Sequence, residues 1–344
     1  MEKSVNDYLI SLLTKFESYI PSREDAQKIE RNRAEFIAEK LTRKKFRRRK
    51  LAEKTRQGIF KKVQLSIEKS KPIHLVIPFG GYKHYWNKSY PEPDWAELFN
   101  FKYLTEFVSP AIAIYKPGVV VEYMSEDLII EKMDNYPKEA LETYSKRFKE
   151  ILEWYNKQIP KNLTFRYFRV CERCDAQKIL ERIEKLLPER KKAFEKLSSE
   201  KKEEELRRSW RSVFWNGQRN LSNLNEKERQ ERVIESRLIE LAYYETESRP
   251  EFMGKYLWED NHICVCFSFG TTYDNDELQD LTLGSTYGSL VDFWIGRGVL
   301  EKRADEFFPR IISKNQYEEL KGKINVLPVT GILPFKNYQQ IELF

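Results

Sequence analysis

The chain has 344 residues, of which 40% are hydrophobic and 33% are charged, so it is long enough to bury a substantial core and too apolar to be disordered. Four cysteines do not supply a disulfide framework for a chain of this length, and its apolar runs are too short to span a bilayer. The first residues also lack the apolar stretch of a signal peptide. We therefore expect a soluble, cytoplasmic protein that does not associate with membranes.

The net charge of +7 is concentrated in one segment. Residues 41–63 contain eleven Lys or Arg and one Glu, a local net charge of +10, which leaves about −3 for the rest of the chain. A basic segment on a nearly neutral body is typical of proteins that bind polyanions. One hypothesis is that Arg47, Arg48, Arg49 and Lys50 bind nucleic acid such as tRNA. The alternative is a solvated helix face.

The first 68 residues have helical periodicity. Apolar residues between Tyr8 and Phe16 recur at helical spacing, and Ser22 is suited to cap a second helix. We expect that second helix to start at Arg23, to continue through the basic run and to reach Val63. The sequence therefore predicts a basic, helical N-terminal segment.

From residue 69 onwards the pattern changes to alternating strands and helices. Asp94, with Glu97 three residues later, is typical of a helix-capping box. Strands are predicted at 73–78, 119–124 and 163–170, with helices from Asp94 to about 115, at 138–157 and at 176–187. Threefold alternation of this kind indicates parallel βαβ units. The predicted fold class is α/β, with a mostly parallel sheet flanked by helices.

Four regions follow from these patterns. Residues 1–68 form the helical segment, and 69–187 form the βαβ core. Densely charged residues 188–248 predict a helical insertion, and 249–344 are expected to supply C-terminal strands that complete the core.

Parallel sheets bind ligands beyond the carboxyl ends of their strands, and this rule selects the loops that follow the predicted strands. In the first loop, Gly80 and Gly81 allow close approach to the backbone, and Lys83 supplies a mobile cation for a phosphate or carboxylate. The alternative is a tight turn with a surface lysine. The predicted catalytic residues are Lys83, Glu126 and Asp127. The predicted substrate-binding residues are Gly80, Gly81, His84, Ser125, Ser268 and Thr271.

The metal-binding patterns are weak. Cys171, Cys174, Cys264 and Cys266 lack the spacing of a zinc ribbon, and the three histidines are scattered through the sequence. The glycine-rich motifs of nucleotide-binding loops are absent. We expect neither a metal nor a cofactor.

Roughly residues 68–157, at the start of the predicted core, resemble the pyoverdine/dityrosine biosynthesis family, which includes the isocyanide (isonitrile) synthases. The matching segments occur in order within residues 68–157, about a quarter of the chain. They are Lys71-Pro-Ile-His-Leu-Val-Ile-Pro-Phe-Gly-Gly-Tyr-Lys83, Pro93-Asp94-Trp-Ala-Glu97, Tyr115-Lys-Pro-Gly118 and Ser125-Glu126-Asp127. The chain differs from the family pattern in having Gly80-Gly81 where the family has Phe-Pro, and Glu126-Asp127 where it has Asp-Gly.

This resemblance implies a Rossmann-like fold and an enzyme that joins an aromatic amino acid to a sugar-phosphate carbon donor without a nucleotide or metal. On this hypothesis Lys83 binds an anionic substrate group, and Glu126 or Asp127 acts as the general base. Two alternatives stay open. One is a nucleic-acid-binding protein that uses the basic helix at residues 43–62, and the other is a non-catalytic interaction protein on the same fold.

Overall fold

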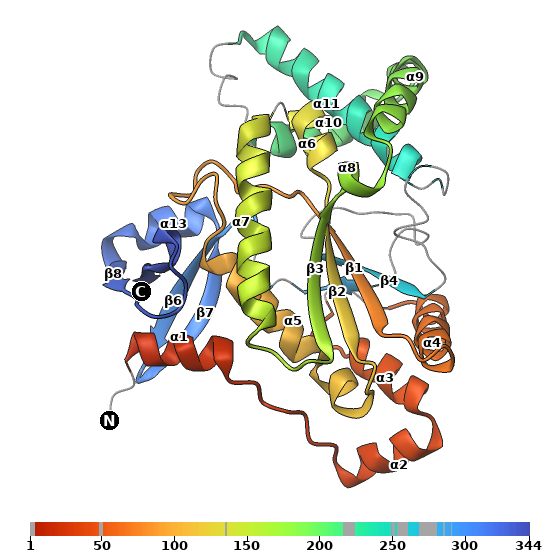
Figure 1. The fold of residues 1–344 in the computed structure, drawn as a ribbon. Helices are drawn as coiled ribbons and strands as arrows, with labels where there is room; N and C mark the ends of the chain where they lie inside the picture. Colours follow the sequence, from red (N-terminus) through yellow and green to blue (C-terminus); the bar gives the residue numbers. More distant parts are fainter. Residues whose placement is uncertain are drawn as a thin grey trace.

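The computed structural model describes residues 4–47, 51–134, 136–215, 224–247, 249, 252, 261–267, 281–284, 286–289 and 291–344. Within them, one parallel sheet forms the centre, a second sheet lies beside it, and a layer of helices covers one end (Figure 1). The helices are α1 (Val5–Thr14), α2 (Arg23–Arg31), α3 (Arg33–Leu41), α4 (Glu53–Glu68), α5 (Trp95–Ile114), α6 (Asp127–Asp134), α7 (Lys138–Asn156), α8 (Val170–Arg173), α9 (Ala176–Glu195), α10 (Ser199–Trp215), α11 (Glu226–Glu247) and α13 (Lys314–Leu320). The strands are β1 (Ile73–Phe79), β2 (Val119–Ser125), β3 (Leu163–Arg169), β4 (His262–Phe267), β5 (Leu281–Leu283), β6 (Arg297–Arg303), β7 (Glu306–Ile312), β8 (Asn325–Pro328) and β9 (Gln340–Leu343).

The central sheet has five described strands in the order β3-β2-β1-β4-β5, and every neighbouring pair is parallel. The predicted α/β fold class is therefore confirmed. The three strands predicted from the sequence lie within one residue of their expected ends. Strands β2 and β4 are buried along their whole length, as near-continuous apolar runs in parallel sheets are.

Helices α5 and α7 cover one face of this sheet (Figure 1). The interface is a cluster of aromatic rings around Phe148, whose centroid lies 5.3 Å from that of Phe79, 5.2 Å from Tyr123 and 5.3 Å from Phe101. The predicted capping box of Asp94 and Glu97 at the start of α5 is confirmed. Pro110 lies inside α5 without splitting it. Aromatic packing thus holds α5 and α7 against the sheet.

The C-terminal region contributes to two sheets. Strands β4 and β5 belong to the parallel sheet, whereas β6 to β9 form a separate four-stranded sheet in the order β7-β6-β9-β8. This second sheet packs closely on the start of α5, because a Cβ atom on Gly298 would lie 2.3 Å from the backbone nitrogen of Ala96. The close approach needs glycine at this position of β6.

The basic run is not part of one long helix, so that expectation is wrong. Helix α3 ends at Leu41 and α4 begins only at Glu53. Between them, Phe46 is buried, and its ring contacts those of Tyr103 and Phe107 at centroid distances of 5.3 Å. Burial of this aromatic side chain draws the backbone out of the helical path, and Arg47 forms an isolated antiparallel bridge with Leu283. Local helix propensity was overridden by a tertiary contact.

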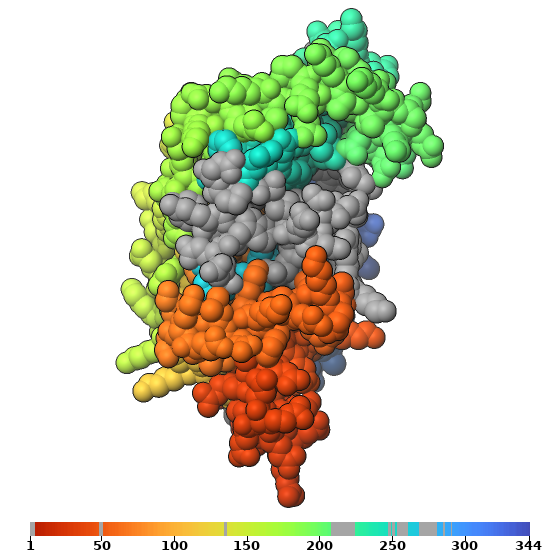
Figure 2. All heavy atoms as spheres, turned by 90° about the vertical axis from the view of Figure 1, so that its right-hand side faces the viewer, coloured from red at the N-terminus to blue at the C-terminus, as the bar shows by residue number. Residues whose placement is uncertain are grey.

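The predicted insertion is helical, but it has no sharp start at 188, since α9 continues through Pro188 to Glu195. Helix α11 packs against α9 and α6. Figure 1 places α9, α10 and α11 above α6 and α8, at the carboxyl end of the strands. Figure 2 shows the N-terminal helices and this helical layer at opposite ends of one face. None of the described helices is both long enough and apolar enough to cross a membrane.

Candidate functional site

The strand order places the candidate site next to β1. The chain fills the sheet from β1 towards β3 on one side and then returns to place β4 on the other side, so the order reverses at β1. Open α/β sheets bind ligands at such a reversal, beyond the carboxyl ends of the strands. The loop after β1, residues 80–84, lies at this position. Ser268 and Thr271, predicted in the loop after β4, lie outside the described residues.

The structure brings the glycine loop against the end of β2. Gly81 has φ +70, and a Cβ atom there would lie 1.8 Å from Ser125 Oγ. A Cβ atom on Gly80 would lie 2.4 Å from the ring of Tyr82. Both positions therefore require glycine, one for its backbone conformation and both for lack of space. Of the predicted substrate-binding residues, Gly80, Gly81 and Ser125 are neighbours in the fold.

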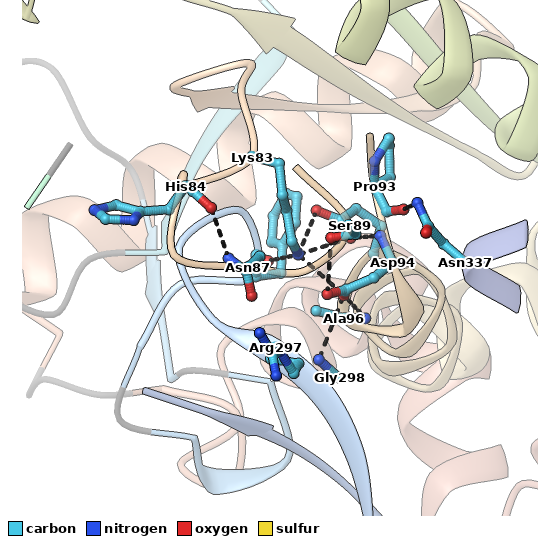
Figure 3. Close-up of polar contacts among 12 residues, drawn as sticks. Lys83, His84, Asn87, Ser89, Pro93, Asp94, Ala96, Arg297, Gly298 and Asn337 are labelled. Atoms are coloured by element: carbon cyan, nitrogen blue, oxygen red, sulfur yellow. Dashed lines mark hydrogen bonds and ion pairs between the residues drawn. The ribbon is translucent and has the colours of Figure 1, made fainter. Parts of the chain in front are cut away.

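Lys83 is fully buried, so the expectation of an exposed, mobile cation is wrong. Its ammonium nitrogen lies 3.0 Å from Asp94 Oδ1 (Figure 3). It also lies 3.1 Å from both carboxylate oxygens of Glu97. It also donates to the Phe293 carbonyl oxygen at 2.9 Å. The physical reason is the capping box of α5, which places two carboxylates next to this loop. Buried ammonium groups need such partners.

The Lys83 network is almost completely hydrogen-bonded. Glu97 accepts from the backbone N–H of Asp94 at 2.8 Å and from the Tyr144 hydroxyl at 3.0 Å. Asp94 accepts from the backbone N–H of Ala96 at 2.8 Å. Burial and the charge of Asp94 raise the pKa of Glu97, and the charge of Lys83 opposes them. A buried network with its partners in place rigidifies the structure around it, so these contacts fix the loop after β1.

A second polar cluster lies at the carboxyl ends of β2 and β3. Ser125 pairs with Arg169 across the two strands, and Arg169 Nε donates to Asp127 Oδ2. Tyr167 points to the same face of the sheet, two residues before Arg169. Three buried atoms here have no hydrogen-bond partner within the described part of the chain: Ser125 Oγ, Asp127 Oδ1 and the Tyr167 hydroxyl. Natural proteins rarely leave such atoms unsatisfied, so this cluster is the strongest candidate for ligand contact.

The electrostatics of this cluster suit proton transfer. Burial raises the pKa of Asp127, and the neighbouring Arg169 guanidinium only partly opposes it. Burial likewise raises the pKa of Tyr167. Ser125 lies close enough to influence both groups, although its Oγ makes no hydrogen bond of standard geometry to any described residue. A carboxylate with a raised pKa is an effective general base near neutral pH.

Sequence reasoning identified Ser125 and Asp127 but missed Tyr167 and Arg169. The available signal was their spacing of two at the end of a predicted strand, which places both on one face. Glu126, the other predicted base, donates its backbone N–H to the Phe79 carbonyl and accepts at its own carbonyl from Ile129 at the start of α6. Its catalytic role stays a prediction.

His84 is buried and points away from the Lys83 network (Figure 3). Its backbone N–H donates to the Trp294 carbonyl at 2.9 Å, and its Nδ1 accepts from the backbone N–H of Trp86 at 3.3 Å. Burial lowers the pKa of His84 to about 3, with a smaller effect from the charges of Lys314 and Lys83. The imidazole is therefore neutral at physiological pH. The side chains of Lys83 and His84 therefore lie in different environments, although the two residues are adjacent in the sequence.

The described residues contain no group of three or more His, Cys, Asp or Glu side chains arranged to hold a metal ion. None of the four cysteines is part of a disulfide bond. Cys171 is exposed, whereas Cys264 and Cys266 are buried in β4.

Of the candidate nucleic-acid-binding residues, the structure describes Arg47, whose Nε donates to the Thr42 carbonyl oxygen at 2.6 Å. Arg48, Arg49 and Lys50 lie outside the described residues. Helix α4 packs near β1 and β4 and leads into the start of β1, whereas the candidate site follows the strand ends. Helix α4 thus lies towards the starts of the strands, whereas Arg47 bridges Leu283, the last residue of β5, at the carboxyl end of the parallel sheet.

No protein-family model and no curated protein matches the sequence. Among solved structures, the crystal structure of the PvcA protein from Pseudomonas aeruginosa is similar, with a TM-score of 0.59 over 87% of this chain and 95% of that chain. The chain has the fold of PvcA. Sequence identity is 14%, so the likeness is one of fold. It confirms, at that level, the resemblance to the isonitrile synthase-like family that the sequence motifs indicated.

Proposed function

We propose that this protein is a biosynthetic enzyme similar to the isonitrile synthases, acting on an amino acid-like substrate and a phosphorylated sugar or another anionic small molecule. One observation carries the proposal. Three buried polar atoms without partners among the described residues gather where a PvcA-like sheet presents its carboxyl ends. Buried, unsatisfied polar atoms cost free energy that a bound ligand recovers.

The geometry suits the two charged ends of an amino acid. Asp127 Oδ1 is the acceptor for its ammonium group. The terminal NH groups of Arg169 make no hydrogen bond to any residue that the structure describes, since Arg169 contacts Asp127 through Nε alone. A planar guanidinium is suited to a carboxylate. The Ser125 and Tyr167 hydroxyls complete a polar set that orients the substrate.

An ammonium group must lose a proton before its nitrogen can attack a carbonyl carbon. Asp127 accepts that proton, and the amine lone pair then forms a C–N bond with the carbonyl carbon of the second substrate. Two protons must reach the carbonyl oxygen before it leaves as water: Asp127 returns the proton it accepted and then transfers a second one from the newly bonded nitrogen, which leaves a protonated imine. The raised pKa of Asp127 suits it to both transfers.

The remaining predicted residues have supporting roles in this proposal. Gly80 and Gly81 allow the backbone to approach the ligand, and the buried Lys83 holds their loop in place. Glu126 is a second candidate base. Ser268 and Thr271, which follow β4 in the sequence, are proposed substrate contacts.

The experiment is carbon transfer from a ¹³C-labelled sugar phosphate to an aromatic amino acid, followed by mass spectrometry. We expect a labelled, amino acid-derived product from the wild type and at least a hundredfold less from Asp127→Asn. Glu131→Gln, on the same helix, is the matched control and should keep activity. If the wild type yields no product with any sugar phosphate or aromatic amino acid, the proposal is wrong.

The nucleic-acid hypothesis stays a separate prediction. Within the basic run, Lys44 and Lys45 are exposed, as are Lys54 and Lys61 on α4. Charge neutralisation at Arg47, Arg48, Arg49 and Lys50 is expected to weaken binding of tRNA and to flatten its salt dependence. Filter binding at several salt concentrations measures this. If tRNA binding does not depend on salt, or if no binding occurs, the nucleic-acid hypothesis is wrong. A non-catalytic interaction protein is then the alternative to an enzyme.

A further inference from the structure

The hydrogen bonds of His84 determine where its imidazole carries the proton. Nδ1 accepts a hydrogen bond from the backbone N–H of Trp86 at 3.3 Å, so Nδ1 is unprotonated. Burial keeps the ring neutral, since the pKa of His84 is lowered to about 3. A neutral imidazole with an accepting Nδ1 has its hydrogen on Nε2. His84 therefore presents one N–H donor in a defined direction.

That donor has no acceptor among the described residues. His84 is 2% exposed, and its Nε2 atom is buried without a hydrogen-bond partner in that part of the chain. The imidazole ring is held in place by stacking on Tyr85, with a centroid distance of 4.5 Å and an interplanar angle of 27°. A buried N–H group held rigidly without an acceptor is costly, and natural proteins keep few of them.

The position and surrounding charge indicate which acceptor would fit. The loop that carries His84 follows β1, where the strand order reverses and α/β sheets bind ligands. The positive charges of Lys83 and Lys314 both act on His84. The charge of Lys83 is compensated by Asp94 and Glu97, whereas no ion pair of Lys314 occurs among the described residues. The local field therefore favours an oxygen that carries negative charge.

We propose that His84 Nε2–H donates a hydrogen bond to an oxyanion of the second substrate, a phosphate ester or a carboxylate, and so forms the anion-binding part of the site. This inference deepens the proposed function, because it assigns a binding group to the anionic substrate named there. In this role His84 takes the place of Lys83, because the ammonium group of Lys83 is already bound by protein oxygens.

Two substitutions of His84 distinguish the role of the Nε2–H donor from that of the Nδ1 acceptor. His84→Gln places an amide N–H near the position of Nε2 and keeps the donor. His84→Asn places an amide near Nδ1, within reach of the Trp86 N–H, and removes the outer donor. Since the Nε2 hydrogen makes no bond to a described residue, we expect both variants to unfold at temperatures close to each other.

The test is a calorimetric titration of the wild type and both variants, once with glycerol 3-phosphate and once with glycerate. We expect the wild type and His84→Gln to bind at least one anion, and His84→Asn to bind it at least tenfold more weakly. The anion that binds identifies the phosphate ester or the carboxylate as the ligand class. In ¹⁵N-histidine spectra of the wild type, the same anion should shift the Nε2 resonance of His84.

Equal binding by His84→Asn and wild type, or no binding of either anion to the wild type, would overturn this inference. So would a spectrum in which His84 carries its hydrogen on Nδ1. Binding is measured without turnover, so a failure of the proposed reaction is recognised separately. Asp127→Asn is expected to abolish carbon transfer while anion binding persists.

Discussion

Two buried polar clusters lie near the same end of the central sheet, and they differ in how completely they are satisfied. In the Lys83 network, the ammonium group is bound by Asp94, Glu97 and the Phe293 carbonyl. In the cluster of Ser125, Asp127 and Tyr167, three buried atoms have no partner within the described residues. Both clusters combine a carboxylate with a cation. Burial is common to both clusters, so what separates the structural network from the candidate site is the hydrogen-bonding capacity left unsatisfied in the second.

The largest expected effect tests the structural reading of the Lys83 network. Lys83→Met removes the cation and leaves two carboxylates buried, so we expect a loss of about 3–5 kcal/mol in the free energy of unfolding. Urea denaturation measures it. Lys88→Met is the control, because Lys88 is 65% exposed and its pair with Glu342 contributes at most about 1 kcal/mol. A fully stable Lys83→Met protein that fails to bind substrate would reverse the comparison and restore Lys83 as a ligand-binding residue.

The second effect concerns the contact between the glycine loop and the site. Gly81→Ala combines an unfavourable positive φ with a collision against Ser125 Oγ, and we expect a loss of about 2–4 kcal/mol. Gly331→Ala is the matched control, since Gly331 has φ +76 and nothing within 4 Å of an added Cβ atom. The difference between the two denaturation curves measures the collision. A second change, Ser125→Ala, should recover part of it, and no recovery would show that the collision is not with Ser125.

The third effect is a change of stability with pH that reports the protonation of Glu97. Its pKa is raised in the folded protein, chiefly by burial, so the folded state binds more protons than the unfolded state above the ordinary value of 4.5. The contribution of Glu97 to stability is thus fully present below pH 4.5 and is lost as the pH rises through the raised folded value. We expect the stability of the wild type relative to Glu97→Gln to fall by about 1 kcal/mol or more over this range.

Denaturation at a series of pH values gives that difference. Glu139→Gln, an exposed position in the first turn of α7, should show no such trend. A difference that rises with pH would mean that the Lys83 ion pair dominates and that the pKa of Glu97 is lowered instead.

The smallest effect on stability is expected at the candidate site. Ser125→Ala removes a buried hydroxyl that makes no hydrogen bond to a described residue, so the free energy of unfolding should change by less than about 1 kcal/mol. Binding of an aromatic amino acid should weaken at least tenfold. Thr105→Ala is the comparison, because its buried hydroxyl bonds the Phe101 carbonyl and lies 2.9 Å from the Tyr155 hydroxyl. Thermal unfolding and calorimetry should therefore rank the two variants in opposite orders.

The main elements of the framework could be predicted from local sequence patterns. The apolar runs of β1, β2 and β3 predicted a parallel sheet, and Asp94 with Glu97 predicted the start of α5. The two glycines after β1 marked the loop that lies against Ser125. These features depend on residues close together in the chain, whose periodicity, capping and backbone freedom are encoded locally.

Which polar residues have hydrogen-bond partners depends on contacts that form only in the folded protein. Lys83 is buried because the Phe293 carbonyl, 210 residues later, completes its partners. The basic run leaves the helical path because Phe46 packs on Tyr103 and Phe107. Arg169 reaches Asp127 only once β2 and β3 are paired. Each outcome depends on contacts between segments that are distant in the sequence. The free energy of these contacts exceeds the local backbone preferences on which sequence-based prediction relies.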